Sequence, residues 1–160
     1  ARNFGNVISI EVDSQRYTFL KNNIDAYGFK NVHIINGSCA DIVPKINNID
    51  VIYIDPPWGG KNYRNSEKLR LTLDDSQDKI TKVPVQIETI IKNFFDVTYM
   101  LSVPKLIALK LPKNYDLKYL YDSFNGTTDE FDIYMYELKK MLIIIIERKE
   151  QVVYISTSAP

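Results

Sequence analysis

Short apolar runs alternate with helix-forming segments along most of this chain, and this alternation constrains the fold more than any other feature. Strand-length apolar runs occupy residues 7–12, 32–35, 51–54 and 106–111. Between the first two runs, apolar side chains recur at spacings of three and four residues, at Tyr17, Leu20, Ile24 and Tyr27. Asp13 or Ser14 is a suitable N-terminal cap for that helix, and Gly28 a suitable C-terminal cap.

The remaining elements follow from the same signals. Residues 42–46 predict a short helix, and residues 61–82 a long polar loop with one helical turn. Pro84 suits the first position of a helix whose core face carries Ile87, Ile91 and Phe94 or Phe95. Further along, Asp116 is expected to cap a helix running to about Phe124. Residues 131–138 and 141–147 predict two strands joined by Lys139-Lys140, which is hairpin length.

The resulting order, βαβαβ–loop–αβαββ, predicts an α/β domain. Such alternation implies a mostly parallel sheet with helices on both faces, to which the terminal hairpin adds one antiparallel strand. We expect one domain over residues 1–150 and a tail over residues 151–160. Ligands of these sheets bind at the carboxyl ends of the strands. Glu11, Ser38, Asp55 and Lys113 all lie at or just after predicted strand ends.

Charge and cysteine content restrict the function. The 160 residues carry 20 basic and 20 acidic side chains, so the net charge is zero. A protein that coats duplex nucleic acid normally has a strong basic excess, whereas a nucleotide or one end of a nucleic acid remains a suitable ligand. The single cysteine excludes an internal disulfide and fits an intracellular protein. No apolar run approaches the roughly 20 residues of a membrane span.

The stretch VIYIDPPWGG, residues 51–60, suggests a specific chemistry. Prolines fix the backbone, so the carbonyls of Asp55 and Pro56 are rigid acceptors that can hold the hydrogens of an exocyclic amine. Trp58 offers a face on which a purine can stack, most favourably a cationic one. Gly59 and Gly60 allow close approach of the ligand and let the following loop fold over it. The alternative is an ordinary turn followed by a core tryptophan.

Other side chains have weaker functional signals. His33 and Cys39 have no metal-ligand spacing around them, and Asp74, Asp75 and Asp78 fit a solvated helix start better than a metal site, so no metal is expected. A local basic patch follows Trp58 and suits either a solvated loop or RNA phosphates; it consists of Lys61, Arg64, Lys68 and Arg70. The run Tyr134 to Tyr136 fits sheet packing, or tyrosines that help to hold RNA.

Three local motifs carry a resemblance to a known family. Asp55-Pro56-Pro57-Trp58 resembles motif IV of the amino-methyltransferases that use S-adenosylmethionine. With Gly59, Gly60 and Tyr63 it is similar to the Pro-Pro-Trp-Gly-Gly-x-x-Tyr of trimethylguanosine synthases, which methylate the guanine N2 amine of a 7-methylguanosine RNA cap. The segment from Leu111 through Asn114 resembles the family's Leu-Pro-Arg-Asn, and residues 7–13 resemble its strand ending in acids. The resemblance covers roughly residues 7–148.

The resemblance implies roles for particular residues. It implies a catalytic group that consists of Asp55, Pro56 and Trp58. For S-adenosyl-L-methionine it implies contacts by Glu11, Ser38, Cys39, Asp55 and Pro57, with Glu11 on the ribose hydroxyls and Asp41 as a substitute for Ser38 near the adenine. For the cap it implies contacts by Trp58, Gly59, Gly60, Tyr63, Lys113 and Asn114, the last two at the phosphates.

The resemblance also implies a Rossmann-like class I methyltransferase fold, with one departure. The family's first strand and Gly-rich cofactor loop should precede Val7, where this sequence has six residues. We therefore expect a catalytic domain that is incomplete at its N-terminus, with an upstream segment or a partner chain supplying the loop. The other reading of this departure is that the domain is not an active methyltransferase.

Three functions remain open on the sequence. The first is methylation of the N2 amine of a 7-methylguanosine cap, with capped RNA as the partner. The second is N6-adenine methylation of DNA or RNA, because Asp55 gives the Asp-Pro-Pro-Trp signature of those enzymes. The third is a non-catalytic module that binds a nucleotide or serves as a scaffold. An intracellular site is expected, in nucleus or cytoplasm, for a cellular or a virus-encoded protein.

Overall fold

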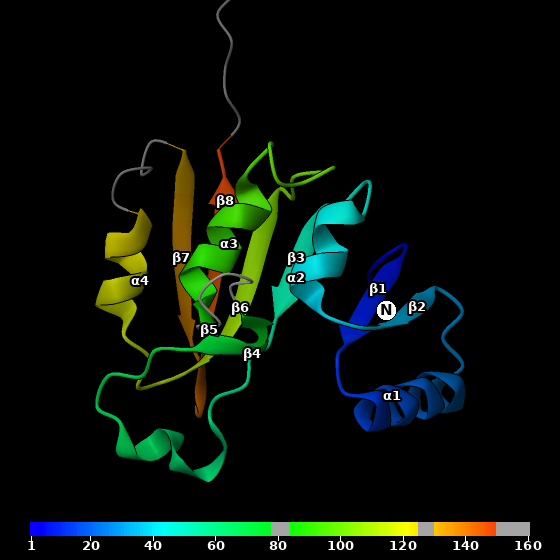
Figure 1. The fold of residues 1–160 in the computed structure, drawn as a ribbon, viewed down its shortest axis with the longest axis horizontal. Helices are drawn as coiled ribbons and strands as arrows, with labels where there is room; N and C mark the ends of the chain where they lie inside the picture. Colours follow the sequence, from blue (N-terminus) through cyan, green and yellow to red (C-terminus); the bar gives the residue numbers. More distant parts are fainter. Residues whose placement is uncertain (78–83, 125–129, 150–160) are drawn as a thin grey trace, which may run out of the picture. The chain divides into compact units, whose positions relative to one another are not determined.

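The computed structural model describes residues 1–77, 84–124 and 130–149 (Figure 1). The chain divides into two compact units. The first unit combines Ala1–Asn48 with Thr72–Val103. The second combines Ile49–Leu71 with the chain from Pro104 onward. Within the described residues, no helix is both long and apolar enough to span a membrane.

The first unit begins with a parallel βαβ arrangement. Strand β1 (Val7–Glu11) pairs in parallel with β2 (Val32–Asn36), and helix α1 (Ser14–Tyr27) connects them. The Asp13 side chain accepts a hydrogen bond from the Arg16 amide at 2.8 Å, so the predicted cap is Asp13. Gly28 ends the helix with φ 69°, a left-handed conformation that glycine adopts without strain.

The short helix after β2 starts earlier than predicted. Helix α2 (Cys39–Ile42) continues into the 3-10 turn η1 (Val43–Lys45), so the expected helix at residues 42–46 begins three residues sooner. Ser38 occupies the N-cap position, and a serine there favours a helix start.

Two predictions for the middle of the chain were wrong. Part of the expected loop at residues 61–82 is strand β4 (Thr72–Gln77), which pairs antiparallel with β5 (Pro84–Gln86). Leu71 and Leu73 are both buried, a period-two signal that the polar residues around them obscure. Pro84 begins β5 rather than a helix, and α3 (Ile87–Phe95) starts after it. Residues 78–83 lie outside the described residues, including the predicted candidate Asp78.

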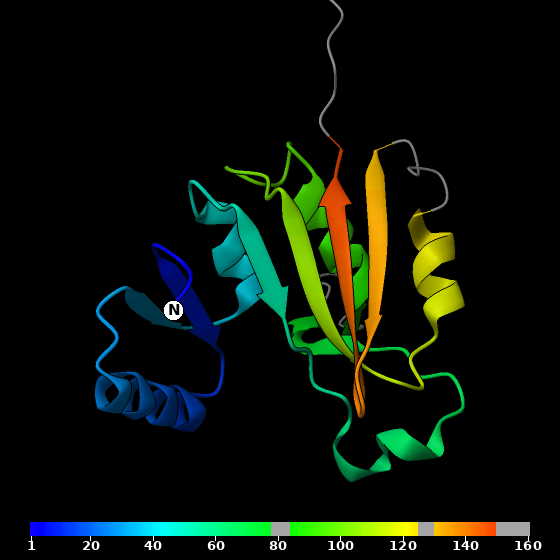
Figure 2. The ribbon, with the colours of Figure 1, turned by 180° about the vertical axis from the view of Figure 1, so that it is seen from behind.

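The second unit contains a four-stranded mixed sheet in the order β3-β6-β8-β7 (Figure 2). Strand β3 (Val51–Ile54) is parallel to β6 (Leu106–Pro112). Strands β7 (Phe131–Glu137) and β8 (Met141–Arg148) form the predicted hairpin. Strand β8 lies between β6 and β7 and is antiparallel to both, so it is the one antiparallel strand that the sequence predicts.

On the two central strands, β6 and β8, one face is apolar and buried. On β6 the buried side chains are Ile107, Leu109 and Leu111, and on β8 they are Leu142, Ile144 and Ile146. The residues between them point to the opposite face and are half-buried, as the period of two requires. Burial of these branched side chains removes apolar surface from water, which is the main force that holds the sheet in place.

Helix α4 (Leu117–Phe124) lies beside β7 in this unit (Figure 1). The rings of Phe124 and Phe131 meet edge to face, with centroids 5.9 Å apart. The Asp116 side chain accepts a hydrogen bond from the Tyr119 amide at 3.1 Å, so Asp116 is the helix cap that the sequence predicts.

Candidate functional site

Trp58 stands just after the end of β3 and is fixed to the neighbouring strand. Asp55 follows the last residue of β3 directly, Pro56 is buried, and Pro57 is exposed. The indole Nε1 of Trp58 donates a hydrogen bond to the backbone carbonyl of Lys110 on β6, at 3.3 Å. This bond fixes the edge of the indole to the sheet, so the ring has a defined orientation at the carboxyl end of β3.

The two glycines after Trp58 turn the chain back toward the indole. Gly59 has φ 85° and Gly60 has φ 67°, both in the left-handed region where a side chain would be strained. The turn leads into the 3-10 segment η2 (Gly60–Asn65), which carries Tyr63. The Tyr63 ring meets Trp58 nearly edge to face, with centroids 5.4 Å apart and planes at 70°. The double glycine therefore lets one aromatic ring support the other.

Asp55 and Lys110 form an ion pair beside the indole. The Lys110 ammonium lies 2.6 Å from Asp55 Oδ2 and 5.6 Å from the centre of the Trp58 ring. The hydrogen bond that Lys110 donates to Asp55 raises the pKa of Lys110 above its ordinary value, against the opposite effect of partial burial. Lys110 is therefore cationic at neutral pH, and its charge is compensated by Asp55.

The segment after β6 holds the loop that carries Tyr63. Asn114 Nδ2 donates hydrogen bonds to the backbone carbonyls of Tyr63 and Ser66, each at 2.7 Å. Lys113, one residue earlier, lies 2.6 Å from Glu137 Oε1, and this contact lowers the pKa of Glu137. The two predicted phosphate ligands thus have protein partners in this structure, and Asn114 fixes the loop.

The end of the same loop is also anchored. The Leu69 amide donates to the Asn114 carbonyl at 2.8 Å, and the Asp116 amide donates to the Leu69 carbonyl at 2.8 Å. Arg70 pairs with Asp116 at 3.3 Å, and its guanidinium lies 3.8 Å from the centre of the Tyr119 ring. Arg70, part of the predicted basic patch, therefore has a structural partner.

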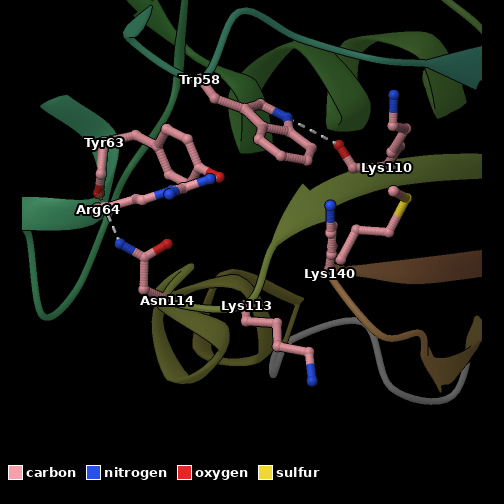
Figure 3. Close-up of a pocket in the computed structure, with 8 residues that line it drawn as sticks. Trp58, Tyr63, Arg64, Lys110, Lys113, Asn114 and Lys140 are labelled. Atoms are coloured by element: carbon pink, nitrogen blue, oxygen red, sulfur yellow. Dashed lines mark hydrogen bonds between the residues drawn. The ribbon is translucent and has the colours of Figure 1, made fainter. Parts of the chain in front are cut away.

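A cavity of about 560 Å³ lies beside the indole (Figure 3). It is lined by Trp58, Tyr63, Arg64, Lys110, Lys113, Asn114, Lys140 and Met141. Four of these eight side chains are basic and none is acidic, which suits an anionic ligand with an aromatic part. Of the predicted basic patch, Arg64 lines the cavity. Sequence reasoning missed Lys140 and Met141, and the only signal for them was their place at the predicted hairpin turn.

The predicted cofactor residues of the first unit lie at the ends of adjacent parallel strands. Glu11 is the last residue of β1, and its Oε1 accepts a hydrogen bond from the Asp13 amide at 2.9 Å. Among the described residues, the Ser38 hydroxyl after β2 is buried and has no hydrogen-bond partner. Cys39 is half-buried at the start of α2, and Asp41 in the same turn is exposed.

These residues fit the adenosyl part of S-adenosylmethionine. The second carboxylate oxygen of Glu11 can accept from a ribose diol, as acids at this position do in nucleotide-binding α/β folds. A buried hydroxyl without a partner is costly unless a ligand or water satisfies it, so Ser38 is suited to a polar ligand atom. No group of three or more potential metal ligands is found among the described residues.

The fold is that of the Rossmann-like methyltransferases. The chain is similar in structure to the METTL16 methyltransferase domain, with a TM-score of 0.58 and 12% identity over 89% of this chain and 50% of that one. It is also similar to SMU.1697c of Streptococcus mutans, which was solved in complex with SAH. The TM-score is 0.52 and the identity 12%, over 90% of this chain and 76% of that one. The predicted fold class is confirmed.

The sequence comparison narrows this class to a family. The RNA cap guanine-N2 methyltransferase family matches residues 1–157, and the chain belongs to that family. Protein L320 of Acanthamoeba polyphaga mimivirus is 30% identical over 151 residues, which cover 92% of this chain and 52% of the relative. The chain therefore spans about half the length of that relative. The prediction of a methyltransferase of the cap guanine-N2 kind is confirmed at the level of the family.

Proposed function

We propose that the protein of which this chain is part methylates the exocyclic N2 amine of a 7-methylguanosine RNA cap, with S-adenosylmethionine as the methyl donor. The observation that carries this proposal is the orientation of Trp58, which Lys110 and Tyr63 hold at the mouth of a cavity lined by basic side chains. A methylated guanine is cationic and stacks favourably on indole, while the cap phosphates suit the basic lining.

Asp55 and Pro56 are the proposed groups that orient the amine. One carboxylate oxygen of Asp55 is engaged by Lys110, and its second oxygen and the backbone carbonyls of Asp55 and Pro56 are the proposed acceptors for the amine hydrogens. Holding both hydrogens directs the nitrogen lone pair toward the methyl donor. Positioning of this kind accounts for much of the rate enhancement when two reactants are brought together, and no strong base is needed.

In the first unit, Glu11 is the proposed ligand of the ribose hydroxyls and Ser38 of the adenine side, with Cys39 beside Ser38. Asp55 and Pro57 of the second unit are proposed cofactor contacts as well. When bound, S-adenosylmethionine supplies an electrophilic methyl group on its sulfonium. Gly59, Gly60 and Tyr63 form the loop around the base, and Lys113 is a proposed phosphate ligand that exchanges Glu137 for phosphate.

A methyl-transfer assay with the full-length protein tests the proposal. Short RNAs that carry a 7-methylguanosine cap, an unmethylated guanosine cap or no cap are incubated with S-adenosylmethionine. Digestion to nucleosides and mass spectrometry then locate the added methyl group. We expect methylation of the guanine N2 on the 7-methylguanosine cap, and at most slow reaction with the other RNAs.

Other outcomes would redirect the assignment. Methylation of adenine in RNA or in a DNA control would replace the cap reaction by the N6-adenine alternative. Binding of capped RNA without methyl transfer under any of these conditions would favour the non-catalytic module. Equal methylation of both cap types would remove the role given to the cationic base.

A further inference from the structure

We propose that Arg64 and Lys140 form a phosphate subsite in the cavity beside Trp58, which binds the polyphosphate of a nucleotide whose base stacks on the indole. The proposal rests on the proposed function for the identity of the base. It adds Arg64 of the loop and Lys140 of the hairpin to Lys113, the phosphate ligand that the proposed function takes from the Leu-Pro-Lys-Asn segment.

The charges of the cavity lead to this assignment. Of the four basic side chains that line it, Lys110 is paired with Asp55 at 2.6 Å and Lys113 with Glu137 at 2.6 Å. Among the described residues, neither of the other two has an acidic partner within ion-pair distance. The uncompensated positive charge of the cavity therefore belongs to Arg64 and Lys140, and an incoming anion need not break an existing ion pair to reach them.

Arg64 is oriented by its neighbour on η2. Its Nε donates a hydrogen bond to the Tyr63 hydroxyl at 3.3 Å, and its guanidinium carbon lies 5.6 Å from the centre of the Tyr63 ring. Within the described part of the chain, its two terminal nitrogens donate no hydrogen bond to another residue. A guanidinium fixed through Nε can still present both terminal nitrogens to phosphate oxygens, which is the geometry of a bidentate contact.

Lys140 enters the cavity from the turn of the hairpin. It is the last of the three residues that connect β7 and β8, and the turn is closed by a hydrogen bond from the Leu138 amide to the Met141 carbonyl at 2.9 Å. Figure 3 shows Arg64 and Lys140 on opposite sides of the cavity, whereas the Lys113 amine extends away from Trp58. Lys139 belongs to the same turn but does not line the cavity.

The two cations come from separate segments and leave the indole face between them. A single phosphate next to a stacked nucleoside is small compared with a cavity of about 560 Å³. A chain of phosphates can contact the Arg64 guanidinium on one side and the Lys140 ammonium on the other. The ligand class is therefore a nucleoside polyphosphate, of which the 5′–5′ triphosphate of a cap is one form.

Calorimetric titration of the full-length protein tests the subsite. The ligands are 7-methylguanosine, its monophosphate, its triphosphate, and inorganic triphosphate without a base. We expect affinity to rise with the number of phosphates. We expect Lys140→Ala and Arg64→Ala each to weaken binding of the triphosphates by about tenfold, the typical effect of one charged hydrogen bond, and to leave nucleoside binding unchanged.

Lys139→Ala is the matched control, since it removes the same charge from the same turn. It should change every affinity by less than about twofold, the effect of a distant charge in salt. Equal effects of Lys139→Ala and Lys140→Ala would overturn the subsite, because a non-specific electrostatic attraction between the ligand and the basic surface would then explain both. Equal loss of nucleoside and triphosphate binding in Lys140→Ala would overturn it too.

The inorganic probe separates this inference from the proposed function. If the nucleoside does not bind but inorganic triphosphate binds and depends on Lys140, the cap assignment fails and the subsite stands. If the nucleoside binds and its triphosphate binds with the same affinity, the subsite fails and the cap assignment stands.

Discussion

At the residue scale, Trp58 is held by three contacts of different kinds. A hydrogen bond fixes its edge, the Tyr63 ring supports it, and the Lys110 ammonium lies 5.6 Å from the ring centre. A tryptophan that served only to fill the core would not line an open cavity, as Trp58 does. The arrangement presents a ring whose orientation is set before any ligand arrives, which lowers the entropic cost of stacking.

Substitution of Trp58 should separate stacking from orientation. Trp58→Ala is expected to weaken binding of 7-methylguanosine by about tenfold or more, because base stacking on an aromatic ring is worth about 1–3 kcal/mol. The affinity of Trp58→Phe should lie between those of the wild type and Trp58→Ala, since phenylalanine keeps a ring but loses the hydrogen bond to the Lys110 carbonyl. Calorimetry gives the affinities, and Tyr121→Ala, an exposed ring on α4, is the control. Unchanged affinity in Trp58→Ala would remove Trp58 from the base site.

The ion pair of Asp55 and Lys110 has a defined dependence on pH. The folded pKa of Lys110 lies above its ordinary value of 10.5, chiefly because of the hydrogen bond with Asp55. A raised folded pKa means that the contribution of the Lys110 charge to stability is present below 10.5 and is lost as pH rises through the folded value. The pair is therefore intact throughout the neutral range.

Asp55→Asn is expected to lower the pKa of Lys110, because it removes the largest cause of the increase and leaves partial burial acting in the opposite direction. Titration of the lysine side-chain carbons by NMR measures this value. Asp50→Asn is the control: Asp50 pairs with Lys105 at 3.0 Å and should leave the Lys110 value unchanged. An unaltered Lys110 pKa in Asp55→Asn would show that the pair does not persist in solution.

At the element scale, the loop from Gly59 to Leu71 depends on the segment after β6. Asn114 bonds to two of its carbonyls, and Leu69 bridges to the residues around Tyr115. Tyr63 lies in the 3-10 segment η2 and not in a strand, so its position depends on the hydrogen bonds that Asn114 donates to the loop. Asn114, which the family resemblance places at the phosphates, acts in this structure as a positioning residue for the loop.

Asn114→Ala should loosen the loop and weaken binding of the base by the same factor whether or not the ligand carries phosphates. Two hydrogen bonds are lost, each worth about 0.5–1.5 kcal/mol. We expect faster amide hydrogen exchange in η2 and an equal loss of affinity for 7-methylguanosine and its triphosphate. Asn62→Ala, an exposed position of η2, is the control. A loss confined to the triphosphate would show instead that Asn114 is a phosphate ligand.

At the scale of the whole molecule, the proposed functional groups are divided between two compact units. Glu11 and Ser38 belong to the first, and Trp58 with the cavity belongs to the second. Each unit contains parallel strands whose carboxyl ends carry these groups. In the second unit the central strands β6 and β8 supply the buried face that holds the site in position.

Neighbouring substitutions on β8 test where the core lies. Ile144→Ala is expected to lower the free energy of unfolding by about 2–5 kcal/mol, because Ile144 is fully buried and its truncation leaves a cavity. Ile145→Ala, on the opposite face and half-buried, should cost clearly less. Urea denaturation of the full-length protein measures both. Equal losses would mean that the opposite face of the sheet is buried as deeply in solution.

Much of the element order was predictable, because period and capping are local properties. The caps at Asp13, Gly28 and Asp116 and the hairpin at Lys139-Lys140 all follow from a few adjacent residues. The failures have local causes as well. Strand β4 has a weak period-two signal among polar residues, and Pro84 suits the start of a strand as well as the start of a helix.

The sequence by itself determined the α/β class, the family and the motif at the end of β3. These depend on the periodicity of neighbouring residues and on one short run of rigid and aromatic side chains. Only the tertiary structure decided which cations are compensated and which are available. Lys110 and Asp55, or Lys113 and Glu137, are far apart in sequence and meet because the strand order β3-β6-β8-β7 brings them together. The same strand order brings Lys140 to Trp58, and no local pattern encodes that proximity.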